Sequence, residues 1–213
     1  MHIHRFSISA VLPTLLAAIF LASCAAENLK PEEASTLKQG EGVVVFSVTH
    51  DVADSAQRVA QASFYIGPNR IIVKSERDWL PGTSAFGMNQ NSDFEDLEGQ
   101  LYVLPMSAGI HQIESWRIYT GNRVSITPKK DPTPLSFEVR AGQTIYIGNL
   151  HMRYFSGKNF VGMTLVGSGW PIINNMQQRD LAIYAKRYPD VANRVTVQLL
   201  PLGSWGQPTE IDH

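Results

Sequence analysis

The sequence predicts an all-β protein, an antiparallel β-sandwich with one short helix near its C-terminus. Three observations carry this prediction. The β-branched run GVVVFSVT, which begins at Gly42, is typical of a buried strand, and LSFEVR, which begins at Leu135, alternates apolar and polar residues as a half-buried strand does. A single segment, residues 174–189, repeats apolar residues at helical spacing. Because the strands recur without helices between them, a sandwich is favoured over alternating βαβ units.

The N-terminal residues have the pattern of an export signal that ends in a lipid attachment site. Arg5 precedes a largely apolar stretch, residues 10–22, which is too short to cross a bilayer as a helix. The stretch closes on LASC, whose last residue is Cys24, and it resembles a bacterial lipobox. The resemblance implies cleavage after Ser23, a thioether-linked diacylglycerol on Cys24 and acylation of its new amine by a chain such as palmitate. The alternative is an ordinary secretory signal with an incidental cysteine.

Cysteine usage and charge limit the classes of function. Cys24 is the sole cysteine, so its lipidation would leave the exported domain without disulfides or thiolate metal ligands, and its core must hold it together. A hydrophobic fraction of 44% and a charged fraction of 17% are ordinary for a globular domain. With 18 basic and 19 acidic side chains, the net charge gives no reason to expect nucleic acid as a partner.

The chain divides into four predicted parts: a lipoprotein signal peptide (1–23), a polar tether (24–41), the β-sandwich domain (42–200) and a loosely ordered tail (201–213). A short helix over residues 32–37 is the alternative to a fully extended tether. Gly67-Pro68-Asn69 and Ser107-Ala108-Gly109 are expected to be turns between strands. Apolar positions change phase across Gly148, which predicts a β-bulge or a strand that crosses between sheets.

The predicted helix lies in NNMQQRDLAIYAKRYPD. Asn174 or Asn175 is expected to cap it, and Pro189 to end it. Its apolar face is expected to combine residues at positions i, i+3, i+4 and i+7, namely Leu181, Tyr184, Ala185 and Tyr188. The segment RVTVQLL should then add a last strand.

Three stretches taken together resemble a known group of proteins: GQLYVLPMSAGIHQIESWRI, LSFEVRAGQTIYIGNLHM and RDLAIYAKRYP. They are similar to a group of uncharacterised bacterial lipoproteins with a transthyretin-like, carboxypeptidase-regulatory-like domain. The resemblance covers roughly residues 99–200. It implies a prealbumin-like or Ig-like sandwich in which LP.AG joins two strands of a hairpin. The group supplies no active site to carry over, so function must be argued from a site.

A search for catalytic and metal-binding patterns gives no candidate that outweighs an ordinary structural explanation. Ser168 lies in GSGW, which does not match a nucleophile elbow. The domain's histidines lack the spacing of local metal ligands, so a solvated or hydrogen-bonded role is simpler for His50, His111 and His151, with His213 in the tail. Four acidic residues, Asp93, Glu95, Asp96 and Glu98, do not follow the spacing of a calcium loop. We therefore predict no catalytic residue, no metal and no cofactor.

These observations predict a non-enzymatic envelope lipoprotein that acts as an interaction or assembly module. The lipobox resemblance implies that Ala25, after the cysteine, favours sorting to the outer membrane, where the protein would face the periplasm and meet another envelope protein or a cell-wall component. The long connection from Ser75 to Leu97 is the candidate partner-binding loop, through Trp79, Phe86 and Phe94; its aromatics could instead cover the sandwich edge.

The alternative function is an envelope hydrolase or enzyme subunit whose site assembles only in three dimensions. A third possibility is glycan or small-ligand binding through Trp79, Trp116 or Trp170.

Overall fold

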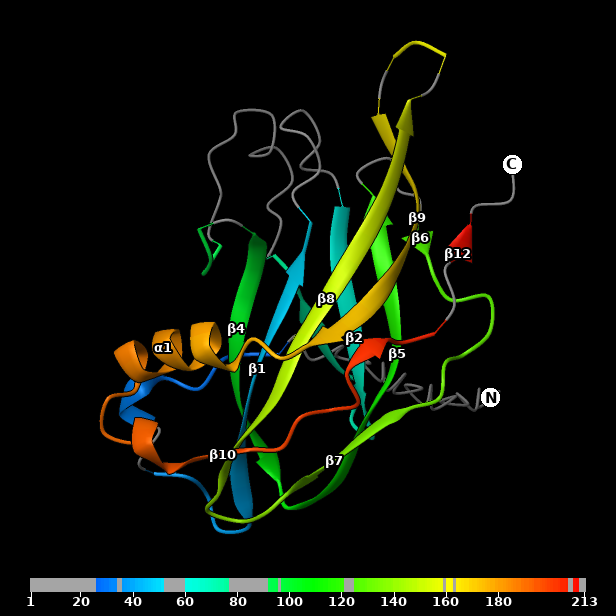
Figure 1. The fold of residues 1–213 in the computed structure, drawn as a ribbon. Helices are drawn as coiled ribbons and strands as arrows, with labels where there is room; N and C mark the ends of the chain where they lie inside the picture. Colours follow the sequence, from blue (N-terminus) through cyan, green and yellow to red (C-terminus); the bar gives the residue numbers. More distant parts are fainter. Residues whose placement is uncertain are drawn as a thin grey trace, which may run out of the picture.

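The structure is a computed structural model that describes residues 26–33, 36–51, 60–76, 92–95, 97–120, 125–158, 160–162, 164–206 and 209–210. Two β-sheets face one another, and one helix lies on the outer face of the larger sheet (Figure 1). The strands are β1 (Glu41–His50), β2 (Ala60–Gly67), β3 (Ile71–Lys74), β4 (Glu98–Ser107), β5 (Gly109–Thr120), β6 (Ser125–Ile126), β7 (Leu135–Val139), β8 (Thr144–Lys158), β9 (Thr164–Asn174), β10 (Val195–Val197), β11 (Gly203–Ser204) and β12 (Thr209–Glu210). The helix is α1 (Gln177–Arg187), and short 3₁₀ turns cover Pro31–Glu33 and Ala192–Arg194.

The larger sheet has the order β11-β9-β8-β1-β4, with β10 beside β8 and β12 beside β9. The smaller sheet has the order β3-β2-β5-β6, with β7 beside β5. The prediction of an all-β sandwich is confirmed at this level. The prediction that it is antiparallel is wrong in part, because β1 and β10 both run parallel to β8. The strands of the smaller sheet lie between β1 and β8 in the chain, whereas β9 and α1 lie between β8 and β10. Each parallel pairing is therefore made possible by its own long connection.

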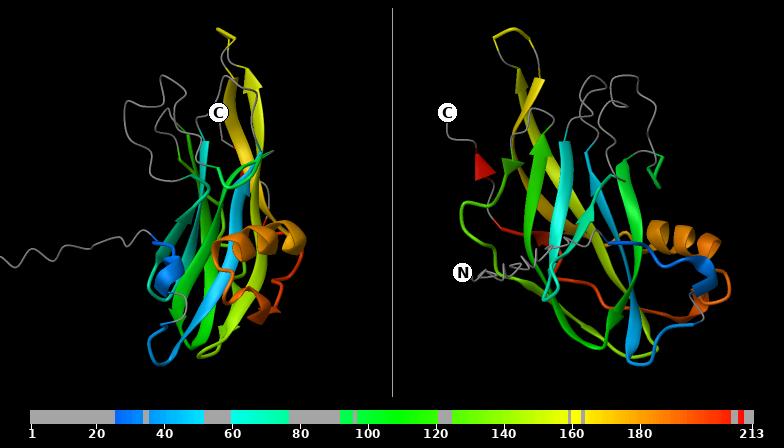
Figure 2. Two further views of the ribbon diagram at one scale, coloured as in Figure 1. Left: turned by 90° about the vertical axis from the view of Figure 1, so that its left-hand side faces the viewer. Right: turned by 180° about the vertical axis from the view of Figure 1, so that it is seen from behind.

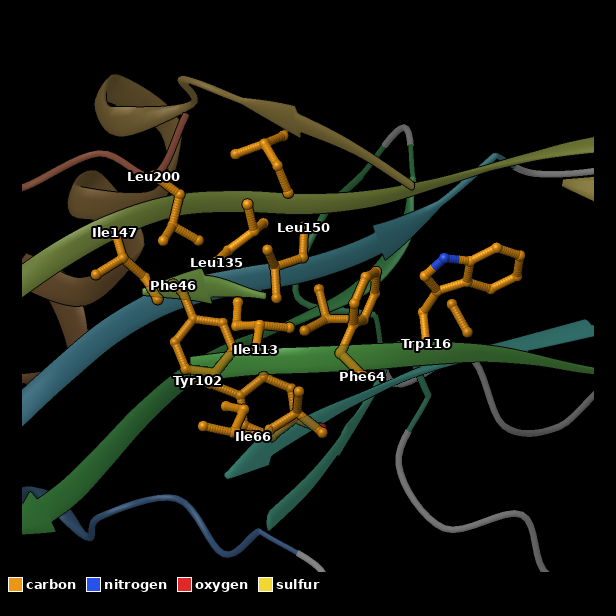
Figure 3. Close-up of a cluster of buried hydrophobic side chains, with 14 of the residues drawn as sticks. Phe46, Phe64, Ile66, Tyr102, Ile113, Trp116, Leu135, Ile147, Leu150 and Leu200 are labelled. Atoms are coloured by element: carbon orange, nitrogen blue, oxygen red, sulfur yellow. The ribbon is translucent and has the colours of Figure 1, made fainter. Parts of the chain in front are cut away.

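The strand β1 explains why the larger sheet is covered on both faces. Its Val44, Phe46 and Val48 lie in the main core between the sheets, which Figure 3 shows from within. Its Val43 and Val45 point the other way, into a second cluster that includes Tyr184 and Tyr188 of the helix region. A strand with apolar residues on both faces is typical of the centre of a covered sheet.

Two local predictions are confirmed in detail. In β7, Leu135, Phe137 and Val139 are buried while the residues between them are exposed. The register of β1 against β8 shifts between Val45 and Phe46, opposite Tyr146 and Gly148, so a β-bulge lies where the apolar phase changes. Gly148 has a φ of +115°, a conformation that only glycine adopts without strain.

The helix begins close to the expected residues, but its buried face differs. Asn175 Oδ1 accepts a hydrogen bond from Gln177 N, and the helix ends before Pro189. Asp180 and Tyr184 are the buried residues of α1, whereas Ala185 is exposed. The apolar spacing therefore located the helix, and the buried carboxylate on its inner face went unpredicted.

Three expectations about the chain's organisation differ from the structure. Residues 26–29 do not form a free tether, because Leu29 is buried in the second cluster. Nor does the packed domain stop at residue 200: the indole of Trp205 is buried in the main core and donates a hydrogen bond to Thr133 O at 2.7 Å. Both segments cover strands that would otherwise leave apolar surface in water. Finally, Ser107 to Gly109 joins strands of different sheets and is not the turn of a hairpin, because β4 pairs with β1 while β5 pairs with β2.

Candidate functional site

A line of polar side chains crosses the outer face of the larger sheet beside α1. On β1 and just after it the line includes Ser47, Thr49 and Asp51, and on β8 it includes Asn149 and His151. Alternate residues of a strand share one face, so these side chains follow Val43 and Val45 along the same surface. We call Ser47, Thr49, Asp51, Asn149, His151 and Asp180 the polar ladder.

The inner end of the polar ladder is centred on Asp180. This carboxylate is fully buried, and Oδ2 accepts hydrogen bonds from Ser47 Oγ at 2.6 Å and from the Tyr146 hydroxyl at 2.8 Å. Arg179 Nε donates to Oδ1 at 2.8 Å. Burial, and then the charge of Asp180, raise the pKa of Tyr146, which keeps the phenol protonated as a donor. A buried carboxylate with this set of donors fixes α1 to the sheet.

Arg179 links this end to the residues that precede β4. Its Nη2 donates to Ser47 Oγ at 3.0 Å, and its guanidinium carbon lies 4.0 Å from the centre of the Phe94 ring. Phe94 is only 8% exposed and belongs to the second cluster. The aromatic ring that the sequence offered as a partner contact is thus covered by a cation–π contact.

The outer end of the polar ladder places a histidine between a hydroxyl and a carboxylate. Asn149 Nδ2 donates to Thr49 Oγ1 at 3.0 Å, which leaves the Thr49 hydroxyl to donate to His151 Nδ1 at 2.9 Å. These partners imply the tautomer in which His151 Nε2 carries its proton and donates to Asp51 Oδ1, 3.0 Å away. The hydrogen bond from His151 is the main cause that lowers the pKa of Asp51.

This order of groups is the order of a catalytic triad, yet the hydroxyl is not placed for attack. A nucleophile must meet substrate, and Thr49 is fully buried with its hydroxyl engaged as donor and acceptor. Asn149 also donates to Ser47 Oγ at 2.8 Å. Asn149 therefore joins the hydrogen bonds around Thr49 to those around Asp180. The arrangement is that of a continuous hydrogen-bond network, which is buried from Asp180 to Thr49 and reaches solvent at Asp51, whose side chain is 43% exposed. Such a network rigidifies a sheet face when all its members are satisfied.

A second polar group lies on the opposite face of the same strands. His50 Nε2 lies 4.0 Å from Glu76 Oε1, and the rings of His50 and Tyr154 are 5.2 Å apart. Burial lowers the pKa of His50 to about 4 and raises the pKa of Glu76 to about 7. Between these pH values both side chains are uncharged, so the contact is not an ion pair. His50 Nδ1 and the Tyr154 hydroxyl are buried and have no hydrogen-bond partner among the described residues.

We predict that Glu76→Gln stabilises the protein progressively as the pH rises. The raised pKa means that folded Glu76 keeps its proton where the unfolded chain has lost it, so wild-type stability falls as the pH passes from about 4.5 through 7. Glutamine removes this loss. The variant's advantage in free energy of unfolding should grow by on the order of 2–3 kcal/mol between about pH 5 and pH 8, measured by urea denaturation. An advantage that does not change with pH would mean that Glu76 titrates like a solvated carboxyl.

The hairpin of β8 and β9 extends past the ends of the other strands (Figures 1 and 2). Near its end Phe160 is 100% exposed, and Val161 and Phe155 are exposed as well. Phe155 stacks on Trp170 with ring centres 4.5 Å apart. Residues 153–170 include Arg153 and Lys158 but no acidic residue. We call residues 153–170 the projecting hairpin. Aromatic side chains that are exposed at and near the end of a strand pair are typical of a contact site.

The structure distributes the sequence-predicted site residues widely. Cys24, Trp79 and Phe86 lie outside the described residues, so their roles stay predictions. Trp116 is buried singly in the main core, as expected of a structural indole, whereas Trp170 is half-buried on the projecting hairpin.

Two other groups that the sequence raised have structural roles. His111 Nε2 contacts Ser107 O at 2.8 Å, and its ring stacks on Phe137. From the acidic stretch, Asp93 Oδ2 accepts a hydrogen bond from Leu101 N at 2.7 Å and pairs with Arg187. The carboxylate of Asp93 therefore has hydrogen-bond and ion-pair partners inside the domain, which gives it a structural role.

No protein-family model matches the chain, and neither the curated proteins nor the solved structures include a significant match. In the described part of the chain, His, Cys, Asp and Glu do not come together in threes that could hold a metal ion. Of the helices that the structure describes, none is both long and apolar enough to cross a membrane.

Most members of the polar ladder were missed by sequence reasoning. Ser47 and Thr49 read as the end of an apolar strand, and their role depends on Asn149, which lies a hundred residues away in the chain. Asp180 did leave a signal, because it precedes Tyr184 by one turn on the face that must be buried. A carboxylate at such a position requires partners from elsewhere in the fold.

Proposed function

We propose that the protein is a non-enzymatic lipoprotein of the cell envelope, anchored in the outer membrane through acylated Cys24 and facing the periplasm. Its prealbumin-like sandwich acts as an interaction or assembly module. The observation that supports this function is the projecting hairpin, because the exposed apolar side chains that it carries, Phe160, Val161 and Phe155, are costly to leave in water. The partner that suits it is another envelope protein, which would cover the aromatic side chains.

Photocrosslinking in cells tests this proposal. A photoreactive residue at Phe160 should give a discrete crosslinked product, because this side chain would lie inside the interface. The matched control is Ile110, which is also apolar and is 72% exposed, but lies on β5 at the turn after β4. It should give no product of that mass. Equal crosslinking from both positions, or none from Phe160, would contradict a contact through the projecting hairpin.

An envelope hydrolase is the second candidate, and the observation that favours it is His151 between Thr49 and Asp51. Thr49 would have to become exposed before it could react. An ester- or amide-hydrolysing activity of the purified protein that is lost in Asp51→Asn would favour this candidate. Activity that persists in Asp51→Asn would come from another source.

A further inference from the structure

Residues 26–29 are held against the sandwich where its two sheets end. Ala26 N donates to Ile72 O of β3 at 3.2 Å, and Leu29 N donates to Val103 O of β4 at 2.8 Å. β3 and β4 are the last strands of their sheets on this side, and they meet through the Tyr102 hydroxyl, which bonds to Lys74 N and Lys74 O at 2.8 Å each. The segment therefore runs from the edge of one sheet to the edge of the other.

The side chains of the segment make this attachment specific. Asn28 Oδ1 accepts from Val103 N at 2.8 Å and Asn28 Nδ2 donates to Leu101 O at 3.2 Å, so the amide acts as a partner strand would. Leu29 is 8% exposed in the second cluster, and its carbonyl accepts a hydrogen bond from the Tyr188 hydroxyl. Edge strands that are covered in this way no longer offer free backbone groups.

We infer that the membrane lies against the β3 edge of the sandwich and holds the domain in one orientation. This inference rests on the proposed function, since it requires the lipid on Cys24. One residue, Ala25, separates Cys24 from Ala26, and extended chain spans at most about 3.6 Å per residue, so the acylated residue lies within about 7 Å of Ala26. The acyl chains must enter the bilayer at that point, beside Ile72.

The chemistry of the β2–β3 hairpin suits a lipid headgroup layer. Residues 60–75 contain Arg70 and Lys74 and no acidic residue, and Arg70 is exposed in the turn before Ile71. Two acidic residues lie nearby: the Glu114 carboxylate approaches Gly67 from β5, and Glu27 is exposed within residues 26–29. Basic side chains close to a bilayer are attracted by its phosphates. The projecting hairpin extends along the direction of β8, well away from residues 26–29 (Figure 2). Phe160 would thus remain clear of the bilayer that holds the anchor.

Site-specific fluorescence tests the orientation. Because Cys24 is the sole cysteine and would be acylated, a cysteine introduced by Asn69→Cys or Phe160→Cys is the one thiol that a fluorophore can label. The lipidated mature protein, which begins at Cys24, is reconstituted in vesicles of phosphatidylcholine and phosphatidylglycerol that carry a headgroup-linked quencher. The label at residue 69, in the β2–β3 turn, should lose most of its fluorescence, and the label at residue 160 should lose little.

A double variant in residues 26–29 shows whether the attachment of this segment to the sandwich sets the orientation. Asn28→Ala combined with Leu29→Ala removes the side-chain attachment to β4, so the loss of fluorescence at residue 69 should diminish while the protein stays on the vesicles. Equal quenching at residues 69 and 160 with Cys24 acylated, as shown by mass spectrometry of the N-terminal peptide, would overturn the orientation alone. An unmodified Cys24 would overturn both the orientation and the anchor.

Discussion

Asp180→Ala is expected to lower the free energy of unfolding by about 3–5 kcal/mol, the range for removing one partner of a buried, paired charge. The carboxylate is fully buried and accepts hydrogen bonds from Ser47, Tyr146 and Arg179. Alanine leaves these donors without their acceptor in an environment that water does not reach. Urea denaturation followed by circular dichroism measures the loss.

Two further variants separate the charge of Asp180 from its shape and position. Asp180→Asn keeps an oxygen that can accept from Ser47 and Tyr146, so its loss should be smaller, about 1–3 kcal/mol. Gln178→Ala changes an exposed residue in the same turn of α1, and it should stay within about 0.5 kcal/mol of the wild type. If Asp180→Ala were as mild as Gln178→Ala, the polar ladder would not be what holds α1 on the sheet.

Gly148→Ala is expected to cost about 2–4 kcal/mol, because two independent penalties meet at the β-bulge. The backbone φ of +115° is strained for any residue with a Cβ atom. In addition, that atom would lie 3.2 Å from Asn174 O on β9. Thermal melting and urea denaturation should both show the loss.

Gly142→Ala is the matched control for this prediction. Its φ of +73° is also left-handed, but a Cβ atom there would meet nothing within 4 Å. It should therefore cost about 1–2 kcal/mol, from backbone strain alone. Equal losses at the two positions would mean that the approach of β9 to the bulge adds nothing.

The projecting hairpin changes where a partner contact is expected. The sequence pointed to the long connection from residue 75 to residue 97, because it combines length with aromatic residues. Of its aromatics, Phe94 is the one that the structure describes, and it is buried beneath Arg179. The sequence did not predict a contact role for Phe160, since one aromatic residue in a short polar turn is as compatible with burial as with exposure.

Local patterns in the sequence determined the elements that depend on neighbouring residues. The alternation around Phe137 located a half-buried strand, the phase change at Gly148 located the bulge, and helical spacing up to Pro189 located α1. Each of these features is decided within a few residues, because side-chain direction repeats every second residue in a strand and about every 3.6 residues in a helix.

Only the tertiary structure decided which strands are neighbours and what their polar residues do. Thr49 and His151 meet because β1 runs parallel to β8, a pairing across a hundred residues of chain that periodicity does not encode. Likewise, Asp180 became the centre of a buried network, and Ala26 to Leu29 became part of the domain, because partners far away in sequence satisfy their polar groups. A buried polar group is stable only where such partners meet it, and that meeting is a property of the assembled fold.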